Sequence, residues 1–427
     1  MGESVLMSEE KRATISIPLD IPDVKVLSTE ISSTGDFIIT VESTLSSTIC
    51  NKCGRVTTEF HCYDRFITLR HLPILDRKVF IRLRPKRYRC PNCSGKPTTT
   101  QQLGFYEPGA STTKAYQQYL LLRLVNSTLE DVSRKEEVGY EAIMGVIDRH
   151  ISREVNWNQH ESIEVLGLDE IALKKGHRDF VVIVTARKGD GRISLLAVLE
   201  DRKKETLKRF LQAIPTRLKK RIETVSTDMY DGFINAVKEE LPSVTRVADR
   251  FHVAKKYREC ADNLRKSEIK RLRKELTEEE YEEIKGAMWP FRKRAEGLKE
   301  EERELLKRLF EHSPELERAY KLREELTAIF EQDLRKEEAI EKIAQWKERV
   351  EGSGLSCFDS FLTMLENWKE EITNYFVKRE TSGFVEGINN RVKVLKRRCY
   401  GIFNLRHLFQ RLFLDLEGYR LFGKTAS

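Results

Sequence analysis

Three acidic residues of this sequence stand where their neighbours have little structural use for a carboxylate. Asp169 and Asp228 each come at the end of an apolar run that is typical of a buried strand, and Glu386 lies in a late, basic, helical stretch. Hard divalent cations prefer carboxylate oxygens, and phosphodiester chemistry without a covalent enzyme intermediate commonly uses two such cations about 3.5–4 Å apart. We therefore predict that Asp169, Asp228 and Glu386 are catalytic and hold two Mg²⁺ or Mn²⁺ ions.

The stretch 381–398 around Glu386 predicts one amphipathic helix. Its apolar face carries Val385, Ile388, Val392 and Leu395. A second face carries Glu386, Asn390, Lys393 and Arg397. Seven Lys or Arg residues and no acid lie between Glu386 and Asp415. We expect Lys393 and Arg397 to contact DNA phosphates beside the carboxylate.

Four cysteines form two C-x2-C pairs, Cys50 with Cys53 and Cys90 with Cys93. Zinc binds four thiolates in a tetrahedron, and a C-x2-C turn supplies two sulfurs at a suitable separation. We predict one structural Zn²⁺ held by these four residues, in a zinc-ribbon-like module. His61 and Cys62 lie between the pairs and are alternative ligands, although a surface turn explains them as well.

The segment between the cysteine pairs is basic. From Arg65 to Arg89 it contains nine Lys or Arg residues, with Phe80 and Tyr88 interleaved. A zinc module with a basic strand suits docking on DNA, and we assign that role to Arg82, Arg84, Lys86 and Arg87. The alternative is a solvated strand face.

The elements that must position the acidic residues begin with 163–199. This stretch predicts three strands, with a hairpin turn at 188–191 between the second and the third. A helix at 203–214, a strand at 222–226, a helix at 235–241 and a strand at 244–248 follow. This order predicts an α/β fold with an RNase H-like core. The last strand leads into Asp249 and His252, which we expect to support the site. For His252, local hydrogen bonding that steadies the site and direct contact with DNA are equally good interpretations.

Two helical segments flank the first part of this core. Residues 111–152 have the layout of a helix-turn-helix, with Thr128 as a helix cap and Arg149 as the strongly basic residue of the second helix. A plain three-helix linker is nearly as good an interpretation. Residues 254–369 are highly charged helices, an insertion whose core we expect Trp289, Trp346, Trp368 and Phe330 to anchor.

Composition agrees with a DNA partner without requiring one. The 427 residues carry a formal net charge of +8, and 40% of them are hydrophobic, enough for several packed cores. The sequence has no apolar run long enough for a membrane span and no signal-peptide core. We expect a cytoplasmic, nucleoid-associated protein without a membrane partner.

Several motifs together resemble a known family. They are the two C-x2-C pairs, LGLDEIALKKGH around Asp169, VSTDMYDGF around Asp228, VADRFHV around Asp249 and GFVEGINNRVKVLKRRCYGIFN around Glu386. In this order they resemble the DDE-type transposases of bacterial insertion sequences, specifically the ISL-three family. The resemblance implies the catalytic trio Asp169, Asp228 and Glu386. It also implies a D-x2-H signature at Asp249 and His252, and double-stranded DNA as partner, both the terminal inverted repeats and the target. A homodimer or higher oligomer on DNA is expected.

We accordingly divide the chain into five parts. They are a zinc-binding, DNA-binding module (1–108), a helix-turn-helix-like domain (109–158), the first part of the catalytic core (159–253), an all-helical insertion (254–375) and the second part of the core (376–427). Two other functions fit parts of the sequence. One is a catalytically idle, transposase-derived DNA-binding regulator, and the other is a RuvC-like structure-specific nuclease.

Overall fold

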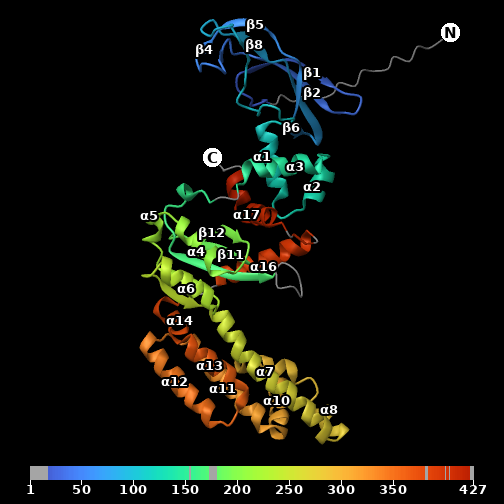
Figure 1. The fold of residues 1–427 in the computed structure, drawn as a ribbon. Coiled ribbons are helices and arrows are strands. Elements are labelled where there is room, and N and C mark those ends of the chain that lie inside the picture. The colour runs from blue at the N-terminus through green and yellow to red at the C-terminus, as the bar shows by residue number, and fades with distance from the viewer. Residues whose placement is uncertain are drawn as a thin grey trace, which may run out of the picture. The chain divides into compact units, whose positions relative to one another are not determined.

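The computed structural model describes residues 18–152, 155–172, 180–379, 383–399, 401–402 and 404–423, without the side chains of residues 384–386. The described chain is a mixed α/β protein (Figure 1). It divides into two compact units, the described parts of Met1–Val146 with Gly418–Ser427, and of Ile147–Glu417. Each unit is considered by itself.

The first unit contains a four-stranded sheet in the order β1-β2-β7-β6. Its strands are β1 (Val24–Ile31), β2 (Phe37–Ser43), β6 (Ile67–Ile74) and β7 (Arg77–Leu83). Strand β2 runs parallel to β7, and the other neighbours are antiparallel. In β7 the apolar residues Val79, Ile81 and Leu83 are buried whereas Arg82 is exposed, the alternation of a strand with one face on a core.

Two smaller sheets frame the cysteine pairs. Strands β3 (Thr48–Ile49) and β4 (Val56–Thr57) pair around the first C-x2-C turn. Strands β5 (Glu59–Tyr63), β8 (Lys86–Arg89) and β9 (Thr98–Thr100) form the other sheet, and the second turn connects β8 with β9. The two turns, whose first cysteines lie 40 residues apart in the sequence, come together where β3 contacts β9.

Three helices follow in the segment for which the sequence predicts them. They are α1 (Lys114–Leu124), α2 (Leu129–Glu136) and α3 (Tyr140–His150). The hydroxyl of Thr128 accepts a hydrogen bond from the backbone N–H of Asp131 at 3.0 Å, so the predicted cap of α2 is confirmed.

The second unit is built on a five-stranded sheet in the order β12-β11-β10-β13-β14. Its strands are β10 (Val165–Ala172), β11 (Phe180–Arg187), β12 (Ile193–Leu199), β13 (Thr224–Thr227) and β14 (Thr245–Ala248). Strands β10, β11 and β12 are antiparallel, whereas β13 and β14 run parallel to β10. The central strand β10 is buried over Val165–Asp169, which explains its nearly continuous apolar sequence.

The helices α4 (Lys204–Ala213) and α6 (Asp231–Glu240) pack against each other and contribute Leu207, Leu211, Phe233 and Val237 to the core of this sheet. A short helix α5 (Thr216–Lys219) connects α4 to β13, and a 3-10 turn at Trp157–Gln159 precedes β10. Each of the two longer helices supplies the crossover that a parallel strand requires.

A long helix, α7 (Arg250–Glu275), leaves the sheet directly after β14 and begins a helical segment. The segment continues with α8 (Glu278–Glu283), α9 (Met288–Arg292), α10 (Glu300–His312), α11 (Pro314–Glu331), α12 (Lys336–Gly352), α13 (Asp359–Asn367), α14 (Lys369–Thr373) and α15 (Tyr375–Lys378), with 3-10 turns at Ala295–Gly297 and Ser356–Phe358. Its core surrounds Trp346, whose indole N–H donates to the carbonyl of Leu322 at 2.8 Å. Trp289 is 63% exposed, so the expectation that it anchors this core is wrong.

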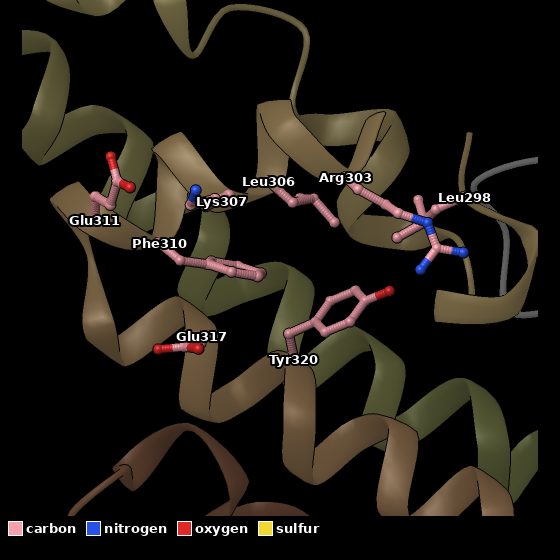
Figure 2. A pocket seen from close by; sticks show the side chains of 8 residues that line it. All are labelled: Leu298, Arg303, Leu306, Lys307, Phe310, Glu311, Glu317 and Tyr320. Carbon is pink, nitrogen blue, oxygen red and sulfur yellow. The ribbon is translucent and has the colours of Figure 1, made fainter. Parts of the chain in front are cut away.

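Helices α10 and α11 leave a shallow groove of about 500 Å³ between them (Figure 2). The rings of Phe310 and Tyr320 meet there, with centroids 5.6 Å apart. Arg303 and Lys307 share its rim with Glu311 and Glu317, so the groove has no dominant charge.

The chain returns to the sheet through α14, which contacts β14, and the side-chain amide of Asn374 donates to the carbonyl of Arg246 at 2.8 Å. Helix α16 (Gly383–Arg398) then contacts β10, and α17 (Leu405–Phe422) follows. Within the ranges described above, no helix combines the length and hydropathy that crossing a membrane demands.

Replacing Trp346 by Ala should lower the free energy of unfolding by about 3–5 kcal/mol, because it opens a large cavity and removes the indole hydrogen bond to the carbonyl of Leu322. Urea denaturation followed by far-UV circular dichroism measures the effect. The matched control is Trp289→Ala, at an exposed position of α9, which should change stability by no more than about 0.5 kcal/mol. Equal losses from both would contradict the assigned core.

Candidate functional site

Asp169 lies within β10. The sequence predicts it at the end of this strand, and that prediction is wrong. Pairing with β11 continues past it, from Asp169 opposite Ile183 to Ala172 opposite Phe180. Pairing with β13 stops one residue earlier, at Leu168 opposite Thr227. The carboxylate therefore stands where β10 loses one of its two neighbours, which opens space for a polar side chain beside a central strand.

Asp228 follows β13 directly, so the register of the parallel pair places Asp228 beside Asp169. The third member of the cluster is His252, in the first turn of α7, whose imidazole Nδ1 contacts the carboxylate of Asp228. Ligand atoms of all three residues lie within 4.8 Å of one another. The structure thus brings together two of the three predicted catalytic acids with one predicted supporting residue.

Asp249 determines where His252 stands. Its carboxylate accepts a hydrogen bond from the backbone N–H of Phe251 at 2.7 Å and so caps the N-terminus of α7. Its backbone N–H also continues the sheet by donating to the carbonyl of Thr227 at 3.0 Å. One residue therefore connects the end of β14, the start of α7 and the orientation of the imidazole.

Burial and neighbouring charges shift the pKa values of two members of the cluster. Asp169 is 4% exposed, and burial, with the negative charge of Asp228 as the second cause, raises the pKa of its carboxyl to about 7. Burial lowers the pKa of His252, but its hydrogen bond to Asp228 and the charges of the nearby aspartates outweigh this effect, so its pKa is raised overall.

Asn389 is the residue that sequence reasoning missed. Its side-chain amide donates to Oδ2 of Asp169, while Oδ1 of Asp169 accepts from the backbone N–H of Glu170 at 2.6 Å. Helical spacing predicts that Asn390, rather than Asn389, shares a face with Glu386. The available signal was helical spacing, since residues three apart are neighbours on a helix surface just as residues four apart are.

Glu386 belongs to α16, but its side chain lies outside the described residues. The helix itself is held against β10 at two points, by Asn389 and by Lys396, whose ammonium donates to the carbonyl of Ala172 at 2.7 Å. Glu386 precedes Asn389 by three residues, about one turn.

The donor set of this cluster fits a divalent cation. It offers carboxylate oxygens that are desolvated and close together, and each oxygen of Asp169 retains acceptor capacity beyond its one hydrogen bond. A cation would offset the repulsion that otherwise favours a proton on Asp169.

The four cysteines form the second cluster. The Sγ atoms of Cys50 and Cys93 are 3.9 Å apart, and that of Cys90 lies 3.7 Å from those of Cys53 and Cys93. A tetrahedron with Zn–S bonds of about 2.3 Å has S–S edges of about 3.8 Å. The geometry therefore fits zinc, and the four-cysteine cluster supports a structural zinc.

The pKa values of the clustered thiols shift in opposite directions. Burial raises the pKa of Cys90, and hydrogen bonding with Cys53 together with burial raises that of Cys93. The backbone N–H groups of Cys53 and Lys52 lower the pKa of Cys50 to about 6. His61 and Cys62 stay outside the cluster, and the imidazole of His61 lies 3.0 Å from the guanidinium of Arg89 instead.

The predicted DNA-contacting residues differ in their surroundings. Arg82 and Arg84 are exposed, and both guanidinium groups lie over the exposed ring of Phe66, at 4.8 and 5.5 Å. In contrast, Lys86 donates to the carbonyl of Ser43 and Arg87 to the hydroxyl of Thr98, each at 2.8 Å.

Arg149 on α3 and Lys393 and Arg397 on α16 are exposed to solvent. Other basic residues of α16 have structural partners, since Arg398 forms an ion pair with Asp415 and Arg391 donates to the carbonyl of the same residue. Some basic residues of α16 therefore hold the helix in place, whereas Lys393 and Arg397 are exposed on its surface.

Two protein-family models match this chain. The model of a transposase family of the DDE, ISL3 type matches residues 166–412, more than half of the chain and the whole of the carboxylate cluster. A model described as the zinc-finger of transposase IS204/IS1001/IS1096/IS1165 matches residues 46–93, which contain all four clustered cysteines.

Curated relatives extend the similarity over most of the chain. The transposase for insertion sequence element IS1001 of Bordetella parapertussis is 27% identical over 382 residues, covering 89% of this chain and 91% of the relative. The transposase for insertion sequence element IS1557 of Mycobacterium tuberculosis is 24% identical over 397 residues, covering 88% and 87%. A solved structure, the Drosophila P element transposase strand transfer complex, matches with a TM-score of 0.37 at 11% identity over 73% of this chain and 93% of that one.

Purified protein should contain one zinc per chain, and Cys50→Ser should lose it, because the remaining three thiolates cannot complete the tetrahedron. The mutation should also unfold the module around β3–β4, since zinc binding supplies folding free energy there. Elemental analysis of gently purified protein measures the metal. Cys62→Ser is the matched control, and zinc loss in that variant or retention in Cys50→Ser would contradict the ligand set.

Proposed function

Because this chain belongs to the ISL3 family of DDE transposases, we propose that it binds the ends of its insertion sequence, cleaves them and joins them to target DNA. The observation that carries this proposal is the pair of neighbouring carboxylates, buried Asp169 and half-buried Asp228, at adjacent positions of parallel strands. A protein that only bound DNA would gain nothing from clustered negative charge that it must desolvate.

We assign the sheet of the second unit to an RNase H-like core, with 254–375 as its helical insertion. The support is the strand order, in which three antiparallel strands are followed by two strands parallel to the first. We keep the domain boundaries at about residues 108, 158, 253 and 375 as part of this proposal.

Asp169, Asp228 and Glu386 would hold two divalent cations, Mg²⁺ or Mn²⁺. When bound, such a pair supplies an activated nucleophile and stabilises the leaving oxygen of an in-line displacement at phosphorus. Asp169, the most buried of the described acids, would contribute to holding both ions, and Asp228 would contribute to holding one. Glu386 is assigned to the other site because α16 lies against β10 one turn beyond it.

His252 and Asn389 are assigned as positioning residues. The imidazole of His252 holds one oxygen of Asp228, and the amide of Asn389 holds one oxygen of Asp169. Both contacts fix the direction of the remaining lone pairs, which is what a preorganised site requires. Asp249 acts one step further back, through the cap that sets the start of α7.

Double-stranded DNA is the proposed partner, as element ends and as target. The zinc module with Arg82 and Arg84 is assigned to docking on the duplex, with Lys86, Arg87 and Arg149 as further phosphate contacts. Lys393 and Arg397 would contact the backbone near the catalytic residues. A homodimer or higher oligomer on DNA in the cytoplasm, associated with the nucleoid, completes the proposal.

Asp228→Ala should abolish strand cleavage, whereas Asp231→Ala should largely retain it. Asp228 belongs to the carboxylate cluster, but Asp231 is exposed in the first turn of α6, where its charge only favours the helix N-terminus. A cleavage assay with Mg²⁺ and DNA carrying the inverted repeats that flank the encoding gene measures both variants. Equal loss in two correctly folded proteins would identify the wrong acid.

Glu386→Gln should abolish cleavage and joining while DNA binding persists or tightens, because the change removes a negative charge and no cation. Lys393→Ala and Arg397→Ala should instead weaken binding and reduce the slope of log K against log salt by roughly one unit per lost phosphate contact. Binding isotherms at several salt concentrations, run alongside the cleavage assay, separate the two effects. Cleavage by Glu386→Gln at nearly the wild-type rate would place the active site elsewhere.

A further inference from the structure

A basic groove begins beside the carboxylate cluster and follows α7 into the helical segment. It has a volume of about 490 Å³, and its lining includes Phe251, Lys255, Arg258, Lys266 and Arg292. Phe251 is the residue immediately before His252, so the groove starts one residue from the side chain that holds Asp228. The groove and the cluster belong to the same compact unit.

The groove follows one face of a single helix. Residues 251, 255, 258, 262 and 266 succeed one another at steps of three or four, the spacing of neighbours on a helix surface. From residue 251 to 266 the helix rises about 22 Å. That length corresponds to about six nucleotides of a strand with a rise of 3.4 Å per nucleotide.

The charge of the groove favours a polyanion. Its one aspartate, Asp262, is already neutralised by Arg265 at 2.9 Å, Arg292 at 2.8 Å and Lys266 at 3.3 Å. Its one glutamate, Glu259, lies 3.8 Å from Lys255, and both side chains are about half exposed, so this pair is weak. The exposed guanidinium of Arg258 has the ring of Tyr257 as a neighbour, at 5.9 Å.

Phe251 determines which form of nucleic acid fits. Its side chain is 47% exposed, and its ring meets the imidazole of His252 edge to face, with centroids 5.7 Å apart. The face of an exposed aromatic ring can stack on a nucleobase, but a duplex hides the faces of its internal bases. An exposed ring at the entrance of a basic groove therefore suits an unpaired strand better than a duplex.

We propose that the α7 groove binds an unpaired DNA strand that leaves the active site, with a base stacked on Phe251 and phosphates on Lys255 and Arg258. This role rests on the proposed strand-cleaving function, because the groove starts at that cluster. It gives the helical segment a direct role in holding one strand of the substrate.

The test compares the affinities of two labelled probes for the full-length, zinc-containing protein. One probe is a blunt 20-base-pair duplex, and the other is the same duplex with a six-nucleotide single-stranded tail. Wild-type protein should bind the tailed probe about tenfold more tightly, and Phe251→Ala should remove that advantage. Lys255→Ala with Arg258→Ala should weaken tail binding and lower its salt slope by about 1.4 units, for two single-strand phosphate contacts.

The matched control removes two exposed lysines from the same helix. Lys256→Ala with Lys274→Ala deletes the same charge about 100° around α7 from Lys255, and should leave the tail advantage unchanged. Phe251→Tyr, which keeps the aromatic face, should restore wild-type preference and guards against a folding defect in Phe251→Ala. The proposal is overturned if the wild-type protein has no tail preference, or if the control loses as much of it as the groove variants.

Binding is read without strand cleavage, so the outcome is independent of the catalytic test. A tail preference that depends on Phe251, in a protein whose cleavage survives Glu386→Gln, would support the groove and reject the catalytic assignment. Cleavage that depends on Glu386, together with equal affinity for both probes, would support the catalytic assignment and reject the groove.

Discussion

The second unit depends on keeping two like charges close together in a poorly hydrated place. Asp169 sits on the central strand with 4% of its surface exposed, and the parallel register fixes Asp228 next to it. Repulsion between carboxylates in such surroundings costs several kcal/mol unless partners or cations compensate. The surrounding elements supply that compensation, since α7 brings His252 to one acid and α16 brings Asn389 to the other.

The two clusters solve the same assembly problem by different means. Each joins residues that are far apart in the sequence, but the cysteine cluster lies among strands of two to five residues, where zinc binding would supply folding free energy. The carboxylate cluster is built on a sheet that is already packed by α4 and α6. The zinc site therefore contributes to the folding free energy of its module. The acidic site instead lowers the stability of its unit, and the packed sheet compensates for that cost.

Much of this arrangement could be predicted from local patterns. Neighbouring residues encode the strands of 163–199, their hairpin turn and the cap at Thr128. The two C-x2-C pairs also predict a shared ligand set, although 36 residues lie between them. Long-range contacts were harder. The apolar run ends at Leu168, where a carboxylate follows, so the sequence predicts the end of the strand there. In the structure β10 continues to pair with β11 as far as Ala172, because pairing depends on a strand that is distant in the sequence.

The same limit explains the other differences. Periodicity describes a helix face but not which of two adjacent asparagines turns to a strand, so Asn390 was named where Asn389 makes the contact. Trp289 was expected in the core from its size alone, yet it lies on a five-residue helix whose buried positions are Pro290 and Phe291. Which side chain a short helix buries depends on how that helix docks, which no local pattern records.

Helix α7 has a mechanical consequence. It is continuous for 26 residues, about 39 Å, and its first turn is capped by Asp249 and carries the imidazole that contacts Asp228. A rigid rod of that length acts as a lever arm, so a tilt of about 5° about the Asp249 cap displaces its far end by about 3 Å. For such a rigid tilt, a displacement of about 3 Å at the far end would correspond to a movement of less than 1 Å at His252, which lies within the first turn.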